Sequence, residues 1–87
     1  MHEASLVGDL MRKIEALAKA ERANRVTIVR VWLGALSHMS ATHFREHFEQ
    51  ASRDTIADGA SLEIEESNDL DEPNAQDLLL RSIEVET

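Results

Sequence analysis

The absence of cysteine from this 87-residue chain is the feature that most restricts its fold. A domain of this size buries only about 60–65% of its unfolded surface, so many small domains add disulfides or structural metal sites. This chain can form no disulfide, iron–sulfur cluster or cysteine-based zinc site, and it has no thiol nucleophile. Its core must be mainly aliphatic, because its only aromatic residues are Trp32, Phe44 and Phe48. At this length we expect one domain, spanning residues 1–87.

The first half of the chain predicts a helix followed by a strand. Between Ser5 and Ala20, apolar residues recur three or four positions apart, which is the pattern of an amphipathic helix. Those residues are Leu6, Val7, Leu10, Met11, Ile14, Leu17 and Ala18. After a short polar connection, Arg25–Leu33 is rich in β-branched and aliphatic residues on both faces, which predicts a central strand that ends at Gly34.

The second half predicts a helix and two strands. Ser40 is a favourable N-cap for a helix that runs to about Arg53, with Phe44, Phe48 and Ala51 at helical spacing. The segments Leu62–Glu65 and Arg81–Glu86 alternate with period two, which predicts strands with one face in water. The turn Thr55–Ser61 precedes the first of these strands, and the acidic segment Ser67–Asp77, which holds the only proline, is predicted to be a solvated loop between them.

The order of predicted elements is therefore α-β-α-β-β. The simplest arrangement that buries every apolar stripe is a two-layer α+β fold, in which two helices pack on one face of a three-stranded sheet.

Charge is distributed unevenly along the chain. Residues 1–57 carry 7 acidic and 8 basic side chains (net +1), whereas residues 58–87 carry 10 acidic and one basic side chain (net −9). Such a surface repels phosphates, so we expect no nucleic-acid partner and no anionic membrane surface as partner. No apolar run approaches the roughly 20 residues of a membrane span, and the N-terminus lacks the features of a signal peptide. We expect a cytoplasmic protein.

His2 is the first candidate metal ligand. It follows the α-amine of Met1, and an amine, backbone amides and an imidazole together form a nitrogen-rich donor set that favours square-planar Ni(II) or Cu(II). The alternative is that His2 is an ordinary residue of a frayed terminus.

Three further histidines lie between the predicted strand and the second helix. His43 and His47 flank Glu46 in an H-x-x-E-H pattern, which places both imidazoles on one helix face, and His38 lies just upstream. The pattern permits an inverted zinc peptidase, an auxiliary metal site or a solvated helix edge. A peptidase needs another ligand and a substrate cleft, and the chain is short for one. No phosphate-binding loop is present, because the three glycines are dispersed.

Several stretches, in order, resemble the HypA/HybF family of nickel-maturation chaperones for hydrogenase and urease. The start Met1–Leu6 resembles the family's M-H-E-x-S opening, and Val29–Ser37 resembles a strand that ends in a G-x-L-S turn. The other similar stretches are Phe44–Glu49 (F-x-x-x-F-E), Thr55–Ile64 (T-x-A-x-G-A-x-L-x-I) and the last strand, Arg81–Glu86.

The resemblance implies that Met1, His2 and Glu3 bind Ni(II) in a near-planar set. It implies a metallochaperone, not an enzyme, with a nickel-inserting GTPase and a hydrogenase large subunit or urease as partners. We expect a monomer or weak dimer. The alternative is an acidic protein-interaction adaptor that keeps the fold but does not bind metal.

The chain departs from the family's pattern in two places. Family members typically carry a cysteine-ligated zinc module between the second and third strands, where this chain has only the acidic residues 67–77. It therefore resembles a form without the module, and we expect no structural zinc. Where some relatives have an aspartate near the nickel, this chain has Ser40, which is a better N-cap than metal ligand, and His38 is the nearest alternative donor.

Overall fold

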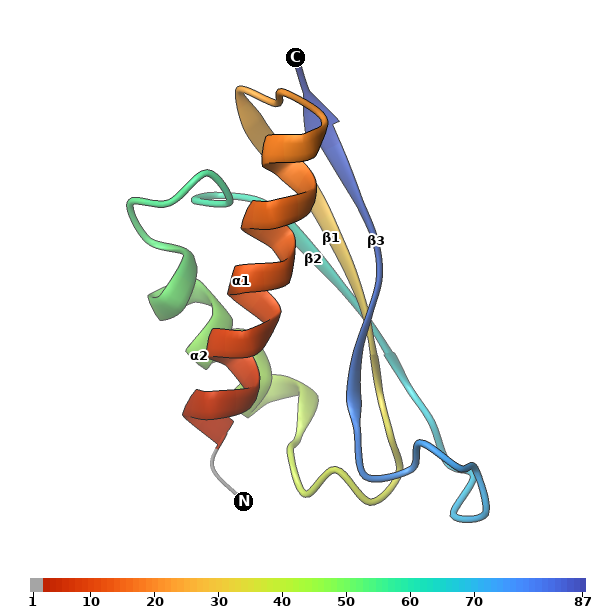
Figure 1. Cartoon of the computed structure of the whole chain (residues 1–87). Helices are drawn as coiled ribbons and strands as arrows, with labels where there is room; N and C mark the ends of the chain where they lie inside the picture. The colour runs from red at the N-terminus through yellow and green to blue at the C-terminus, as the bar shows by residue number, and fades with distance from the viewer. Residues whose placement is uncertain (1–2) are drawn as a thin grey trace.

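The structure is a computed structural model that describes residues 3–87. Its elements are α1 (Glu3–Ala20), β1 (Arg25–Leu33), α2 (Ala41–Ser52), β2 (Ser61–Glu66) and β3 (Leu78–Glu86). Both helices cover the same face of the three-stranded sheet (Figure 1). The α+β class, the element order and the two-layer arrangement predicted from the sequence are confirmed.

The sheet is mixed, with strand order β2-β1-β3. β1 pairs in parallel with β2, to which it is connected through α2, and antiparallel with β3. β1 lies in the centre, as its apolar residues on both faces predicted: Val29 and Val31 face the helices, and Trp32, on the other face, is only 6% exposed.

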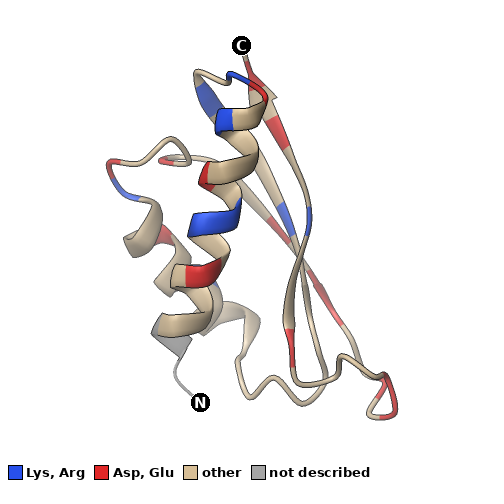
Figure 2. Cartoon of the chain, viewed as in Figure 1, with Lys and Arg blue, Asp and Glu red and all other residues tan. Residues whose placement is uncertain are grey.

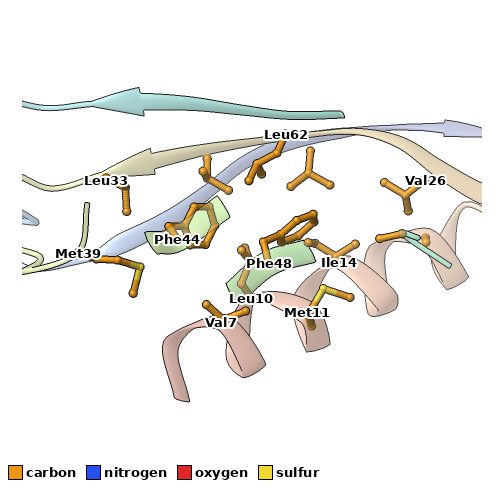
Figure 3. Close-up of a cluster of buried hydrophobic side chains, with 14 residues drawn as sticks. Val7, Leu10, Met11, Ile14, Val26, Leu33, Met39, Phe44, Phe48 and Leu62 are labelled. Atoms are coloured by element: carbon orange, nitrogen blue, oxygen red, sulfur yellow. The ribbon is translucent and has the colours of Figure 1, made fainter. Parts of the chain in front are cut away.

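The core lies between the helices and the sheet. Phe44 and Phe48 of α2 are 0% and 2% exposed, with ring centroids 6.1 Å apart. Figure 3 shows both rings in the layer between the sheet and α1, where Leu10 and Ile14 meet them. The remaining buried members of the cluster are Val7, Met11, Ala18, Val26, Val29, Val31, Leu33, Met39, Ala57 and Leu62.

Two positions assigned to apolar stripes are not buried. Leu17 is 46% exposed, near the C-terminal end of α1. On α2, Ala51 is exposed and Ser52 is buried instead, because the inward face of the helix follows Phe44 and Phe48 at intervals of four. The Ser52 hydroxyl donates to the Glu49 carbonyl (3.4 Å), so its burial leaves no polar atom without a partner.

β3 begins at Leu78, three residues before the predicted start at Arg81, because its backbone continues the ladder with β1 through the pairs Leu79–Trp32 and Leu78–Leu33. This extension shortens the segment available as a loop. The sequence contained no alternation over these residues, since three consecutive leucines face both sides of the sheet.

The connector, residues 67–77, is more ordered than the predicted solvated loop. Gly34 N–H donates to the Asp77 carbonyl (2.9 Å) and Leu36 N–H donates to the Ala75 carbonyl (2.7 Å), so the connector extends the β1–β3 pairing past the end of β1. Ala75 is buried, whereas Leu70, at the tip, is 63% exposed. The connector is therefore docked through its backbone, whereas most of its side chains, including those of Asn74, Gln76 and Asp77, are exposed.

Gly34 allows this docking because it has no side chain. A Cβ atom at Gly34 would lie 2.2 Å from the Ala75 carbonyl oxygen and 2.8 Å from the Asn74 carbonyl oxygen. Both contacts are with backbone, which cannot rotate away as the end of a side chain can. The turn after β1 and the connector can therefore approach this closely only with glycine at this position.

We expect Gly34→Ala to lower the free energy of unfolding by about 1–3 kcal/mol, because the methyl group must displace the connector backbone. Urea denaturation followed by circular dichroism measures this difference. The matched control is Gly8→Ala in α1, where a Cβ atom meets only Arg12 Nη1, at 3.8 Å, and the higher helix propensity of alanine should stabilise by about 0.5–1 kcal/mol. Equal stability of Gly34→Ala and wild type would show that the connector is not docked in solution.

Candidate functional site

The candidate nickel ligands are Met1, His2 and Glu3, the first three residues of the chain. Met1 and His2 fall outside the described residues, and Glu3 is the first residue of the helix. The structure describes the surface around the start of α1. Three segments that are distant in the sequence form this surface.

Those segments are the start of α1, the turn of residues 34–40 after β1, and the beginning of β3. All three lie at one end of the molecule, opposite the C-terminus (Figure 1). A shallow hollow of about 300 Å³ separates α1 from β3 there, lined by Leu6, Asp9, Leu10, Lys13 and Asp77–Leu80. The short turn of residues 21–24 makes β1 run back along α1, so β1 ends near the start of α1, and β3 begins there because it pairs antiparallel with β1.

His38 occupies an exposed position in the turn. Its φ of 61° places it in the left-handed region, which only a few per cent of non-glycine residues adopt. Its neighbours Ser37 and Met39 are 8% and 7% exposed, so the chain is anchored on both sides of the histidine. His38, the alternative donor suggested by the sequence, is thus presented to solvent at the end of the molecule where α1 begins.

Ser40 is the N-cap of α2, as predicted. Its backbone is extended (φ −77°, ψ 154°), and its Oγ accepts a hydrogen bond from the His43 amide N–H at 3.1 Å. The hydroxyl therefore satisfies one of the amides that a helix start leaves without an intrahelical partner.

The H-x-x-E-H histidines lie on the surface of α2. His43 is exposed, and His47 is half-buried beside Val7 and Gly8 of α1. Within residues 3–87, no three or more His, Asp or Glu side chains come together to hold a metal ion. A hollow of about 600 Å³ between α2 and β2 is lined by no histidine. The geometry therefore gives no support to the peptidase interpretation.

Acidic side chains cover the sheet face that the helices leave open. Glu63, Glu65 and Glu84 are exposed there, as the period-two pattern predicted. Arg30 on the central strand binds Glu63 (Nε–Oε1, 2.9 Å) and Glu84 (Nη2–Oε2, 2.6 Å), and these bonds raise the pKa of Arg30 above its ordinary value. Figure 2 shows further acidic residues in the connector.

A cation–π contact covers Trp32 on the same face. The guanidinium of Arg81 lies 5.9 Å from the centroid of the indole ring. Arg30 and Arg81 are therefore both engaged within the sheet, and the connector adds acidic side chains without a basic one. The negative charge predicted for the C-terminal part of the chain thus lies on the open sheet face and in the connector. No helix within residues 3–87 has the length and apolar character needed to cross a membrane.

Two solved structures share this two-layer α+β fold. The solution structure of the Ni metallochaperone HypA from Helicobacter pylori superposes with a TM-score of 0.84 at 23% identity, covering 99% of this chain and 98% of the other. A second solution structure of a HypA protein gives a TM-score of 0.73 at 24% identity, covering 98% and 96%. At these identities the likeness establishes the fold.

The family itself is established by sequence. The family model described as hydrogenase/urease nickel incorporation, metallochaperone, hypA matches residues 1–70, and the chain belongs to this family.

Three curated relatives carry the description hydrogenase maturation factor HypA. The relative from Polaromonas naphthalenivorans is 38% identical over 66 residues (76% of this chain, 57% of the relative), and the one from Cupriavidus necator is 38% identical over 66 residues (76% and 56%). The relative from Archaeoglobus fulgidus is 39% identical over 64 residues (74% and 58%). The chain thus spans somewhat more than half the length of these relatives.

Sequence reasoning identified the N-cap and the exposed histidines but missed the docking of the connector on Gly34. The only signal was a glycine directly after a strand, which is equally typical of an ordinary turn. The partner of that glycine lies 41 positions later and carries no recognisable motif of its own.

Ser40→Ala should destabilise the protein by about 1 kcal/mol, because it removes the acceptor for the His43 amide. Ser40→Asp should retain the stability of the wild type, since aspartate caps a helix equally well. Urea denaturation of the three proteins measures both effects. Wild-type stability in Ser40→Ala would mean that solvent replaces the hydroxyl at no cost.

Proposed function

We propose that this protein is a nickel metallochaperone that delivers Ni(II) for the maturation of a [NiFe]-hydrogenase or a urease. The observation that carries the proposal is the family match over residues 1–70, which includes the Met1-His2-Glu3 opening. We infer that these three residues bind nickel through the α-amine, backbone amides and the His2 imidazole. Nitrogen donors of this kind favour square-planar Ni(II).

The start of α1 at Glu3 supports this assignment. The first amides of a helix have no acceptor within the helix, so metal ligation at this end does not compete with helical hydrogen bonds. A chaperone must also release its cargo, and a site at the start of a helix can be opened without disturbing the core, to which α1 contributes from Val7 onward among residues 5–20.

We infer that the connector, residues 67–77, takes the place of the family's zinc module, so that residues 1–87 form one nickel-binding domain without structural zinc. Three observations support this inference. The chain has no cysteine, the family match ends inside the connector at residue 70, and the connector is closed by hydrogen bonds to Gly34 and Leu36.

The partners that follow from this function are a nickel-inserting GTPase and a hydrogenase large subunit or urease, in the cytoplasm. The acidic sheet face and connector favour protein partners over nucleic acid or anionic membranes. We propose no catalytic role, because the function requires binding and transfer of the ion alone.

Nickel titration tests the N-terminal site. The wild type should bind about one equivalent, with the yellow absorption of low-spin planar Ni(II), because amides and amine impose a strong ligand field. His2→Gln, or a short N-terminal extension that removes the free amine beside His2, should abolish that absorption. His38→Gln is the matched control and should retain it. Unchanged binding after either N-terminal alteration would contradict the proposed site.

The alternative function is that of an acidic protein-interaction adaptor that does not bind metal. The exposed tip of the connector favours it, because Leu70 is 63% exposed beside Asp69 and Asp71. The two functions are separated by measuring binding to purified maturation GTPase and hydrogenase large subunit in the absence of nickel, in parallel with nickel titration. A chaperone should bind both ion and protein, whereas an adaptor should bind protein alone and should lose affinity in Leu70→Ser.

A further inference from the structure

We propose that the outer edge of β2 is a docking site for an extended, basic segment of a partner protein, which adds to the sheet as a further strand. The site itself stands on the geometry of the sheet. That its occupant belongs to a partner in nickel transfer rests on the proposed function.

The two edges of the sheet differ in regularity. Within residues 3–87 the strand order is β2-β1-β3, so the outer side of β2 and the outer side of β3 each lack a neighbouring strand. β2 pairs with β1 in one unbroken register from Ser61 to Glu66. The register of β3 shifts between Leu80 and Ser82, which leaves Arg81 in a bulge. Because bulges twist an edge away from further pairing, β2 is the edge that another strand can join.

The backbone of β2 shows which groups a further strand would meet. Just past the strand, the Ser67 amide donates to the Leu33 carbonyl of β1 at 2.9 Å. Backbone groups alternate in direction along a strand, so those of every second residue before Ser67 also point toward β1. The residues between them direct their N–H and C=O groups outward. They are Leu62, Ile64 and Glu66.

Arg45 of α2 covers one end of this edge. Its Nη1 donates to the outward-facing Leu62 carbonyl at 3.2 Å. Basic side chains are a common means of protecting an exposed strand edge from unwanted pairing. Among residues 3–87, no comparable hydrogen bond reaches the outward groups of Ile64 and Glu66. Those groups are therefore available to a strand of the partner.

The side chains along the edge favour a basic occupant. Glu65 points to the open face of the sheet and Glu66 is exposed at the end of the strand. Arg30 pairs with Glu63, whereas Glu65 and Glu66 form no ion pair with any residue of the described range 3–87. Side chains directly opposite on adjacent strands lie about 4.5–5.5 Å apart at Cβ, where opposite charges attract and like charges repel.

The same charges disfavour a second copy of the chain as the occupant. Antiparallel pairing of two β2 strands would set glutamates of one copy against glutamates of the other. A partner segment with lysine or arginine at these positions gains an attraction where a second copy incurs a repulsion. Strand addition of this kind obtains affinity from the backbone and specificity from alternate side chains.

The helix side of the edge has room for the other side chains of the segment. A hollow of about 600 Å³ lies between α2 and β2, and Phe48, Glu49 and Leu62 are among the residues that line it. Every second side chain of an added strand would turn toward this hollow and toward Ile64, which is half-buried. The segment that fits the edge therefore alternates basic residues on the open face with apolar residues on the helix side.

The test uses the full chain and, as probe, a short capped peptide of alternating lysine and valine. Titration at low salt, followed by NMR, should shift the amide signals of Leu62, Ile64 and Glu66 and slow their hydrogen exchange, because their N–H groups become hydrogen-bonded. The same peptide with glutamate in place of lysine, or with N-methylated amides, should not bind. Equal binding of the N-methylated peptide would show that charge alone holds the probe and would overturn strand addition.

Substitutions locate the site. Glu65→Lys should weaken peptide binding about fivefold or more at low salt, because a repelling charge replaces an attracting one. The matched control, Glu86→Lys, makes the same change on the other edge strand and should leave the affinity within about twofold. Equal affinities of the two variants would contradict the proposal.

Two further variants act on the backbone of the edge. Glu66→Pro removes an outward N–H, which an edge strand tolerates, and should abolish the slowed exchange. Arg45→Ala frees the Leu62 carbonyl and removes a positive charge beside the peptide, so it should strengthen binding. Circular dichroism verifies that each variant is folded. Unchanged binding in Glu66→Pro would place the peptide elsewhere and overturn the proposal.

Sedimentation of the chain alone decides between the occupants. A monomer is expected, because the glutamates repel, whereas a dimer that Glu66→Pro dissociates would show that the edge binds a second copy. Nickel titration separates this proposal from the metal function: Glu65→Lys should give the same absorption as the wild type. Peptide binding in a wild type that binds no nickel would refute the metal function while supporting the edge site.

Discussion

The burial of Phe44 and Phe48 between α1 and β1 is the interaction on which the rest of the structure depends. A chain without disulfides must obtain its stability from packing, and these are its two largest fully buried side chains. Burial of each such side chain contributes about 1.5–3 kcal/mol, a large fraction of the stability of a small domain. Because both side chains project from α2, they fix this helix against the sheet. The position of α2 in turn fixes the Ser40 cap, the turn that precedes the cap, and the backbone of His43 and His47 on the helix surface.

The second constraint is the contact between Gly34 and Ala75. It joins the end of β1 to the connector and gives that end of the molecule a defined backbone. Eleven residues cross between β2 and β3. The connector closes the gap with backbone hydrogen bonds, which need no particular side chains, and its outer residues remain free to carry charge and the exposed Leu70.

The proposed nickel chemistry gathers at the end of the molecule where α1 begins. Amine, amides and imidazole come from the chain terminus, and His38 is displayed nearby in a left-handed conformation between two buried neighbours. His43 and His47 lie on the helix packed against the same part of α1. A small rigid core with its donors on the surface fits a protein that must bind an ion and then give it up, since release requires no change in packing.

The sequence by itself determined the elements and their order, because these depend on local periodicity. It also determined the capped start of α2, because the Ser40 hydroxyl accepts a hydrogen bond from the His43 amide, only three residues later. The donor set at Met1, His2 and Glu3 is a prediction from the sequence, and it can be made there because neighbouring residues need no fold to lie together. Only the tertiary structure decided the early start of β3, the burial of Ser52 and the docking of residues 67–77 on Gly34. These features depend on backbone pairing and packing between residues tens of positions apart, which leave no periodic signal in either segment. The position of His47 beside Gly8 is of the same kind, because only the packing of α1 on α2 brings these two residues together.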